Sequence, residues 1–124
     1  MIPSDDEQRA ARIAKLNDQV RKHVCIPSQF IQRENPHRIV MTRGVSTLPP
    51  ETQFAAYALI RDFADFTGDN DPYGEHDFGS IEHDGHKLFW KFDYYDHQLE
   101  HGSENPDDPA QTCRVLTVML AEEY

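Results

Sequence analysis

The sequence predicts an α+β domain in which a short antiparallel sheet, centred on a β-hairpin at about residues 78–95, packs against two or three helices. Three observations support this class. The dipeptide Asp84-Gly85 is a two-residue turn signal between two stretches of alternating apolar and polar residues. Two other stretches carry apolar residues at helical spacing behind helix-start signals. A chain of 124 residues has the length of one domain, which we take to span residues 1–124.

The first helix is predicted over about residues 5–23. Ser4 and Glu7 have the spacing of a capping box, in which each side chain satisfies a free backbone N–H of the first turn. Apolar residues then recur at helical spacing, at Ile13, Leu16, Val20 and Val24. Residues 1–8, approximately, are expected to be a frayed N-terminal extension, and residues 25–37, which contain prolines, a loop.

A strand followed by a second helix is predicted next. Residues 38–43 are rich in β-branched and apolar side chains and end at Gly44, which is typical of a short strand. Pro49 and Pro50 then mark the first turn of a helix, where a missing backbone N–H costs nothing. The apolar stripe of this helix is expected to end near Gly68, and its members are Ala56, Leu59, Ile60, Phe63 and Phe66.

A two-residue turn at Asp84-Gly85 dictates the register of the predicted hairpin. The expected cross-strand pairs are His83–His86, Glu82–Lys87, Ile81–Leu88, Ser80–Phe89 and Gly79–Trp90. One face then carries Ile81, Leu88, Trp90, Phe92 and Tyr94. This face is expected to pack under the second helix, with Gly79 leaving room for the Trp90 indole beside it.

The C-terminal stretch is open to two interpretations. Residues 96–108 read as a polar loop by composition. Asp108 and Pro109 then make a favourable N-cap and first helical residue. We therefore prefer a helix over residues 110–120, with a buried edge made by Val115, Leu116, Met119 and Leu120. A terminal strand over RVLTVML is the alternative, because period alone does not resolve a short apolar run.

The net charge of −10 is unevenly distributed along the chain. Residues 62–108 hold 2 Lys/Arg and 14 Asp/Glu, whereas residues 1–61 hold 9 Lys/Arg and 6 Asp/Glu. So acidic a segment repels nucleic acid and anionic membranes and favours basic partners or cations. No apolar run is long enough to span a bilayer, and the N-terminus lacks the apolar core of a secretory signal. We therefore expect a cytoplasmic protein in which Cys25 and Cys113 are reduced.

Four stretches occur together in the chain, in the order TRGVSTLPPE, DNDPYGEHDFG, FWKFDYYD and RVLTVMLAEEY. With these motifs the chain resembles a family of small proteobacterial proteins known as domain of unknown function 3768, over roughly residues 9–124. The family has no established activity, so the resemblance implies kinship rather than chemistry. It also implies a setting on plasmids and integrated elements, near genes with anti-restriction or conjugation roles. His97 and His101 lie outside the motifs.

Glu75, His76 and Asp77 are the candidate catalytic residues. A carboxylate beside an imidazole favours proton transfer, and oxygen with nitrogen donors suits a divalent metal. The alternative is that this stretch only caps the turns that its proline and glycine require. His83 and His86 are expected cross-strand neighbours and, with His76, weaker metal candidates, because two ligands do not complete a zinc site. We expect no cofactor and leave a divalent metal open.

The acidic middle of the chain leads to the preferred hypothesis, a binding protein of mobile-element type. Its carboxylates are expected to imitate DNA phosphates and so to block a basic, nucleic-acid-binding host protein, such as a restriction or CRISPR effector. The candidate partner-binding residues are Asp65, Asp69, Asp71, Glu75, Asp77, Asp96, Glu100 and Glu104. The alternatives are a metal-assisted hydrolase that uses Glu75, His76 and Asp77, an interaction protein without mimicry, and an acidic surface that only solvates the chain. The oligomeric state stays open.

Overall fold

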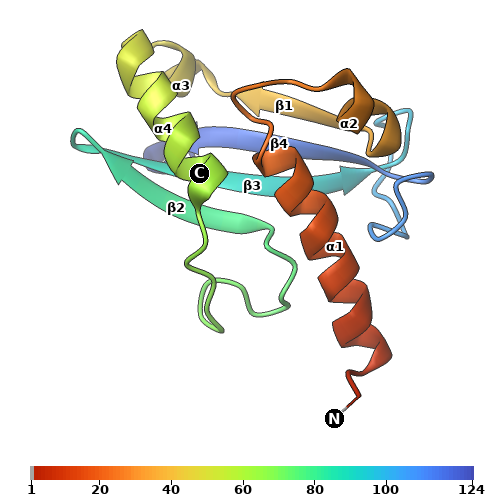
Figure 1. Ribbon diagram of the computed structural model, residues 1–124. Helices are drawn as coiled ribbons and strands as arrows, with labels where there is room; N and C mark the ends of the chain where they lie inside the picture. Colours follow the sequence, from red (N-terminus) through yellow and green to blue (C-terminus); the bar gives the residue numbers. More distant parts are fainter. Residues whose placement is uncertain (1) are drawn as a thin grey trace.

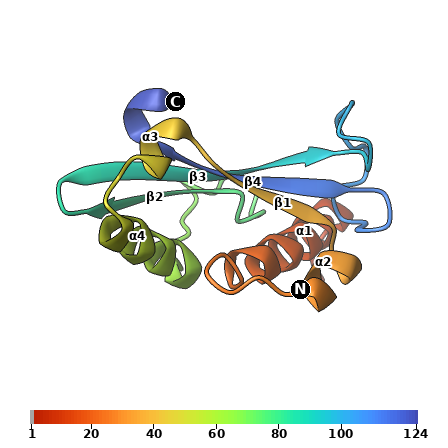
Figure 2. The same ribbon diagram turned by 90° about the horizontal axis from the view of Figure 1, so that it is seen from above.

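The computed structural model describes residues 2–124, and its elements form two layers. The strands are His37–Met41 (β1), Phe78–His83 (β2), His86–Tyr95 (β3) and Cys113–Leu120 (β4). The helices are Asp5–Arg21 (α1), Gln29–Glu34 (α2), Arg43–Ser46 (α3), Pro50–Asp62 (α4) and the 3-10 helix Ala121–Glu123 (η1). The strands form one sheet in the order β1-β4-β3-β2 (Figure 1). Figure 2 shows α1, α2 and α4 on one face of this sheet, with α3 and η1 at one end of the other. The α+β class is confirmed.

The sheet is mixed rather than wholly antiparallel, which corrects the expectation from the sequence. β1 pairs in parallel with β4, from His37 opposite Arg114 to Met41 opposite Val118. The pairs β4–β3 and β3–β2 are antiparallel. Parallel neighbours need a long crossover, which here comprises everything between β1 and β4. A connection of that length leaves no local signal for the pairing.

The hairpin of β2 and β3 has the predicted register at every pair. Asp84 and Gly85 form its turn with φ values of 52° and 78°, as a type I′ turn requires. Gly79 lies opposite Trp90, and a Cβ atom on this glycine would lie 2.3 Å from the indole nitrogen. Because Trp90 is fully buried, packing rather than backbone conformation requires the glycine.

The predicted apolar face of the hairpin forms the centre of the core. Leu88, Trp90 and Phe92 of β3 pack there with side chains from β2, from β4 and from the helices α1, α3 and α4. The buried partners include Val20, Ala56, Ile60, Leu116 and Val118. Each such side chain contributes roughly 1.5–3 kcal/mol when it is fully buried. α4 covers β2, as the sequence predicted for the second helix.

The N-terminal region is more helical than the sequence indicates. The Ser4 hydroxyl caps α1 by accepting from the Glu7 backbone N–H at 3.1 Å. Residues 5–8, expected in the frayed extension, form the first turn with exposed side chains. Residues 29–34, expected as loop, form α2, which is too short to show periodicity. No helix among residues 2–124 has the length and apolar character that crossing a membrane requires.

α4 begins with Pro50 at its first position, as predicted, but it ends at Asp62 rather than near Gly68. Phe63 is extended, with φ −60° and ψ 129°. Phe63 and Phe66 therefore reach Trp90 from the segment after the helix, at ring-centroid distances of 5.5 and 6.2 Å. Leu59, which the sequence places in the stripe, is 41% exposed. The apolar stripe thus belongs partly to α4 and partly to the chain that follows it.

The preferred helix over residues 110–120 is wrong, and the strand alternative is correct. The Asp108 carboxylate caps a turn instead, accepting from the Ala110 N–H at 2.9 Å. β4 lies between β1 and β3, and none of its side chains is exposed. A strand covered on both faces carries a nearly continuous apolar run. Such a run fits a helical period as well as it fits a strand.

A buried charge on β4 positions α1. Arg114 is 0% exposed, and its guanidinium donates to the side-chain oxygens of Asn17 at 2.9 Å and Asn35 at 3.0 Å. It also donates to the carbonyl of Pro106. Burial lowers the pKa of Arg114 to about 10, so the group is still charged at neutral pH. One side chain therefore joins β4 to α1, to the turn before β1 and to the loop before β4.

Replacing Gly79 with leucine should lower the free energy of unfolding by about 1–3 kcal/mol, because the new side chain must displace the buried Trp90 indole. Gly68→Leu is the matched control, since a Cβ atom there meets no heavy atom within 4 Å. Denaturant unfolding of the two variants and the wild type measures the difference. Equal stability of Gly79→Leu and the wild type would contradict the register.

Replacing Arg114 with methionine should lower the free energy of unfolding by about 3 kcal/mol, because two buried amide oxygens and the half-buried carbonyl of Pro106 lose their donor. Arg38→Met removes an exposed arginine from β1 and should change stability by no more than about 0.5 kcal/mol. Urea unfolding compares them. An equal loss of the free energy of unfolding in the two variants would contradict the role of Arg114 in joining the three segments.

Candidate functional site

The three candidate catalytic residues do not converge. The carboxylate of Glu75 accepts from the Tyr94 hydroxyl at 3.3 Å, on the inner side of the loop before β2. The ring of His76 turns instead to Asp18 of α1. Asp77 is half-buried directly before β2. The predicted arrangement of Glu75, His76 and Asp77 around one ligand is therefore not assembled, and His76 has other partners.

His76 lies between the carboxylates of Asp18 and Asp71, and we call these three residues the His76 cluster. Nδ1 of His76 is 3.0 Å from each carboxylate oxygen of Asp18. Nε2 lies 3.8 Å from Oδ2 of Asp71, which is longer than a hydrogen bond. The ring also stacks flat on Phe66, with 3.8 Å between centroids and 1° between planes. These contacts fix both the position and the rotation of the imidazole.

Asp71 holds the backbone that presents His76. Its side chain is 4% exposed, and Oδ1 accepts the backbone N–H groups of Glu75 and His76, each at 3.1 Å. His76 has φ 54°, a left-handed conformation that non-glycine residues keep only where the surroundings impose it. Asp71 therefore caps this turn. The sequence had assigned it to partner binding.

Arg21 also binds the Asp18 carboxylate. Its Nη2 donates to Oδ1 of Asp18 at 2.8 Å. Its Nη1 donates to the carbonyls of Ile60 and Phe63, at 2.7 and 2.8 Å, where α4 ends. The guanidinium carbon lies 4.8 Å from the Trp90 ring centroid. Because the core fixes Arg21, the Asp18 carboxylate is oriented before it meets the imidazole.

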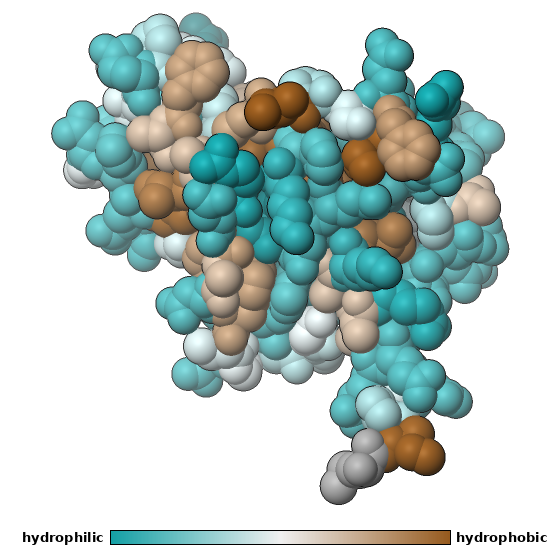
Figure 3. All heavy atoms as spheres, viewed as in Figure 1, coloured by the Kyte–Doolittle hydropathy of each residue, from teal (hydrophilic) through white to brown (hydrophobic). Residues whose placement is uncertain are grey.

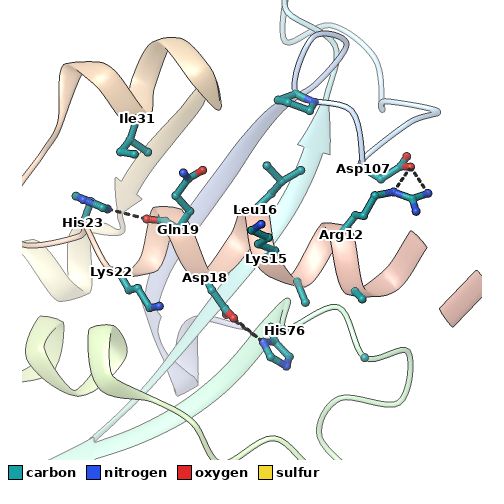
Figure 4. Close-up of a pocket in the computed structure, with 14 residues that line it drawn as sticks. Arg12, Lys15, Leu16, Asp18, Gln19, Lys22, His23, Ile31, His76 and Asp107 are labelled. Atoms are coloured by element: carbon teal, nitrogen blue, oxygen red, sulfur yellow. Dashed lines mark hydrogen bonds and ion pairs between the residues drawn. The ribbon is translucent and has the colours of Figure 1, made fainter. Parts of the chain in front are cut away.

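His76 borders two hollows on the helical side of the molecule. The first, of about 870 Å³, runs along α1 towards α2. The second, of about 610 Å³, lies between the end of α1 and residues 61–66. Figure 4 shows Asp18, Lys22 and His76 on the same side of α1, with Nε2 of the imidazole pointing away from Asp18. The His76 side chain is 30% exposed, so solvent reaches the cluster.

The face that carries these hollows is mainly hydrophilic (Figure 3). Apolar side chains gather over α4 and near α2, where the exposed residues are Ile26, Phe30, Phe54 and Leu59. Over α1 the outward side chains are polar. The hollows beside His76 therefore open on a mainly hydrophilic face, although apolar side chains contribute to their walls.

The eight candidate partner-binding residues divide into two groups. Asp65, Asp69, Glu100 and Glu104 are exposed, and none of them forms an ion pair within residues 2–124. The other four, Asp71, Glu75, Asp77 and Asp96, are buried or half-buried. Only the first group presents free carboxylates to a partner.

His83 and His86 are cross-strand partners next to the hairpin turn, as predicted. Neither joins the His76 cluster. In the part of the chain that the structure describes, no group of three or more His, Cys, Asp or Glu side chains is arranged to hold a metal ion. Metal binding by His76, His83 or His86 stays a prediction.

Asp18 and Arg21 are the site residues that sequence reasoning missed. Asp18 lies 58 residues before His76, so no local pattern connects them. The only signal is the i, i+3 spacing of Asp18 and Arg21 on a helix, which is typical of an ion pair. Their contact with the loop before β2 depends on how α1 packs on the sheet.

The charged forms of the Glu75 and Asp77 carboxylates are unfavourable in the folded protein. Burial raises the pKa of Glu75 above its ordinary value, and the nearby Asp77 carboxylate raises it further. Burial likewise raises the pKa of Asp77. The pKa of Tyr94 is also raised, chiefly by burial, so its hydroxyl remains protonated and donates to Glu75. The charged forms of Glu75 and Asp77 therefore destabilise the folded state.

Residues 41–123 match a protein family described as "Protein of unknown function (DUF3768)". The match extends from the last residue of β1 to the end of η1. It is narrower than the resemblance over residues 9–124, because α1 and α2, and with them Asp18 and Arg21, lie outside it. No curated protein and no solved structure matches the chain.

Replacing Glu75 with glutamine should change how stability depends on pH. Folded Glu75 holds its proton more tightly than the unfolded chain does, so its contribution to stability falls as the pH rises from the ordinary pKa of 4.5 to the raised value. Glutamine keeps an acceptor for the Tyr94 hydroxyl but has no charge. Relative to the wild type, Glu75→Gln should therefore gain stability across that interval and keep the gain above it.

Urea unfolding at a series of pH values measures this difference. Glu104→Gln, which removes an exposed carboxylate, is the matched control for the loss of one charge. A difference between Glu75→Gln and the wild type that is the same at every pH would contradict the buried, destabilising carboxylate.

Proposed function

The chain belongs to the DUF3768 family of proteins of unknown function, and we propose that it is an acidic binding protein that acts as a DNA mimic. In this proposal it occupies the basic surface of a nucleic-acid-binding host defence protein, such as a restriction or CRISPR effector. It acts in the cytoplasm and needs no cofactor. The mobile-element setting that the resemblance implies is consistent with such a role.

The observation that carries the proposal is that the loops between α4 and β2 and between β3 and β4 carry four exposed carboxylates, none of which has a cationic partner within residues 2–124. They are Asp65, Asp69, Glu100 and Glu104. By contrast, Asp107 is paired with both Arg9 and Arg12. An unpaired carboxylate is available to a lysine or arginine of a partner without first breaking an internal ion pair.

The free carboxylates lie in two loops that flank α1. One loop joins α4 to β2 and carries Asp65 and Asp69, and the other joins β3 to β4 and carries Glu100 and Glu104. α1 contacts both loops. Arg9 donates to the Glu104 carbonyl at 2.9 Å, and the side-chain amide of Asn17 donates to the backbone carbonyl of Glu75 in the first loop. A partner would therefore meet two acidic contacts with α1, which has equal numbers of acidic and basic residues, between them.

The remaining members of the predicted set support the loops instead of contacting a partner. Asp71 caps backbone N–H groups, and Glu75 accepts from a buried hydroxyl. Asp77 is half-buried, and burial raises its pKa. Asp96 accepts from the Glu100 N–H at 3.1 Å and lies 3.5 Å from a histidine nitrogen. The proposed contact surface therefore consists of the four free carboxylates.

Reversing Asp65, Asp69, Glu100 and Glu104 to lysine should weaken binding to a basic partner by about fourfold to several hundredfold, since each exposed charge pair contributes roughly 0.2–1 kcal/mol. The matched control reverses four exposed acids outside these loops, Asp6, Glu34, Glu51 and Glu122. It changes the net charge by the same amount and should weaken binding much less. Equal loss in both variants would show that only net charge matters and contradict a defined contact surface.

The partner is found by pull-down from host lysate and then titrated as a purified protein. Binding should fall steeply with salt, because the Debye length shrinks from about 10 Å at 0.1 M to about 3 Å at 1 M. Excess duplex DNA should displace the protein. If binding of the partner does not change with salt, competing DNA or charge reversal, the chain is an ordinary interaction protein and not a DNA mimic. If no basic partner is found, the acidic residues only solvate the surface.

A further inference from the structure

We propose that the His76 cluster is a general-base site, which activates water to hydrolyse a phosphate ester bound in the adjacent hollow. The inference does not depend on the proposed binding function. It differs from the hydrolase expected from the sequence because Asp18 and Asp71, rather than Glu75 and Asp77, are the partners of His76.

The Asp18 carboxylate selects one tautomer of a neutral His76. A carboxylate only accepts hydrogen bonds, so Nδ1, which lies 3.0 Å from both of its oxygens, carries the proton. The lone pair of the ring is then on Nε2, the nitrogen that points away from Asp18 (Figure 4). A carboxylate prepares a histidine as general base in this way.

We place the attacking water between Nε2 of His76 and Oδ2 of Asp71. These two acceptors are 3.8 Å apart, and neither donates to the other while the ring proton is on Nδ1. A water oxygen about 2.8 Å from each atom would donate a hydrogen bond to both. One water proton would then point at Nε2, where general-base catalysis requires it.

The hollow of about 610 Å³ beside the cluster has a small excess of positive charge, because three cations and two carboxylates line it. Arg21 and Arg61 are paired with Asp18 and Asp62, so the cation available to a phosphate is Lys22, and Phe63 and Phe66 form part of the wall. Lys22 forms no ion pair within residues 2–124, and lysine ammonium groups bind phosphate oxygens as point charges. The aromatic side chains offer a wall for an apolar alcohol group. This combination indicates a phosphate ester of an apolar or aromatic alcohol.

The cluster is more elaborate than a contact that fastens the loop to α1 would need to be. Such a contact requires only the bond to Asp18. Here the chain also keeps His76 at φ 54° and stacks its ring on Phe66. Strained backbone and fixed rotamers are typical of side chains held ready for a ligand. The 30% exposure of His76 leaves the ring open to that ligand.

In the proposed reaction the water oxygen attacks phosphorus while Nε2 of His76 takes one water proton. The bond between phosphorus and the ester oxygen breaks, and its electron pair goes to the leaving oxygen, which takes a proton from solvent. His76 then releases its proton to solvent, and the products are phosphate and the alcohol. Lys22 offsets the charge on the phosphoryl oxygens. Because Nε2 itself takes the proton, turnover should persist in EDTA.

The probes are p-nitrophenyl phosphate and bis(p-nitrophenyl) phosphate, assayed with the full chain in EDTA. The wild type should release p-nitrophenolate above the buffer rate. His76→Gln should lower the rate by about 10²- to 10⁴-fold, and Asp18→Asn by at least about tenfold, because it disturbs the tautomer. Lys22→Ala should raise KM. Lys15→Ala and His97→Gln, a lysine of the same helix and an exposed histidine, should keep the wild-type rate.

Nitrogen-15 NMR of the wild-type imidazole gives a readout that survives if a variant fails to fold. At the assay pH it should show a proton on Nδ1 of His76 and none on Nε2, and p-nitrophenyl phosphate should shift the Nε2 signal. A fully protonated ring would overturn the proposal. Turnover no faster than buffer, equal turnover in a folded His76→Gln, loss of turnover in EDTA, or faster hydrolysis of p-nitrophenyl acetate than of the phosphate probes would overturn it as well.

Discussion

The buried guanidinium of Arg114 is the interaction on which the arrangement of the other elements depends. A charge in the core is tolerated only when its donors are satisfied. Here the acceptors are Asn17, Asn35 and Pro106, which belong to three separate segments. Satisfying one side chain therefore places α1, the turn before β1 and the loop before β4 against the same end of β4. The Tyr94 ring, 5.5 Å from the guanidinium carbon, lies against it as well.

α1 carries this constraint to the candidate site. Asn17, which accepts from Arg114, is followed directly by Asp18, and the next turn of the helix places Arg21 against Trp90. The geometry of the His76 cluster is thus inherited from core packing. The same helix also separates the two loops that carry the four free carboxylates, so one element organises both the cluster and the acidic surface.

Local signals were sufficient for the hairpin and for the start of α4. A two-residue turn sets the register because side chains alternate with period 2, and Gly79 opposite Trp90 follows from it. Pro50 marks a helix start because its φ is restricted and it lacks an N–H. No local signal of this kind identifies β4 as a strand. Its apolar run suits a helix or a strand until β1 and β3 supply hydrogen-bond partners on both sides.

For the site, the sequence alone determined that His76 lies in an acidic, turn-forming stretch and that carboxylates are in excess around it. It did not distinguish free carboxylates from structural ones, since Asp69 is exposed and Asp71, two residues later, is buried. Nor did it join His76 to Asp18, because only the packing of α1 brings together residues 58 positions apart. The sequence determined which chemical groups are present. The tertiary structure decided their pairing and exposure, because both depend on contacts between distant segments.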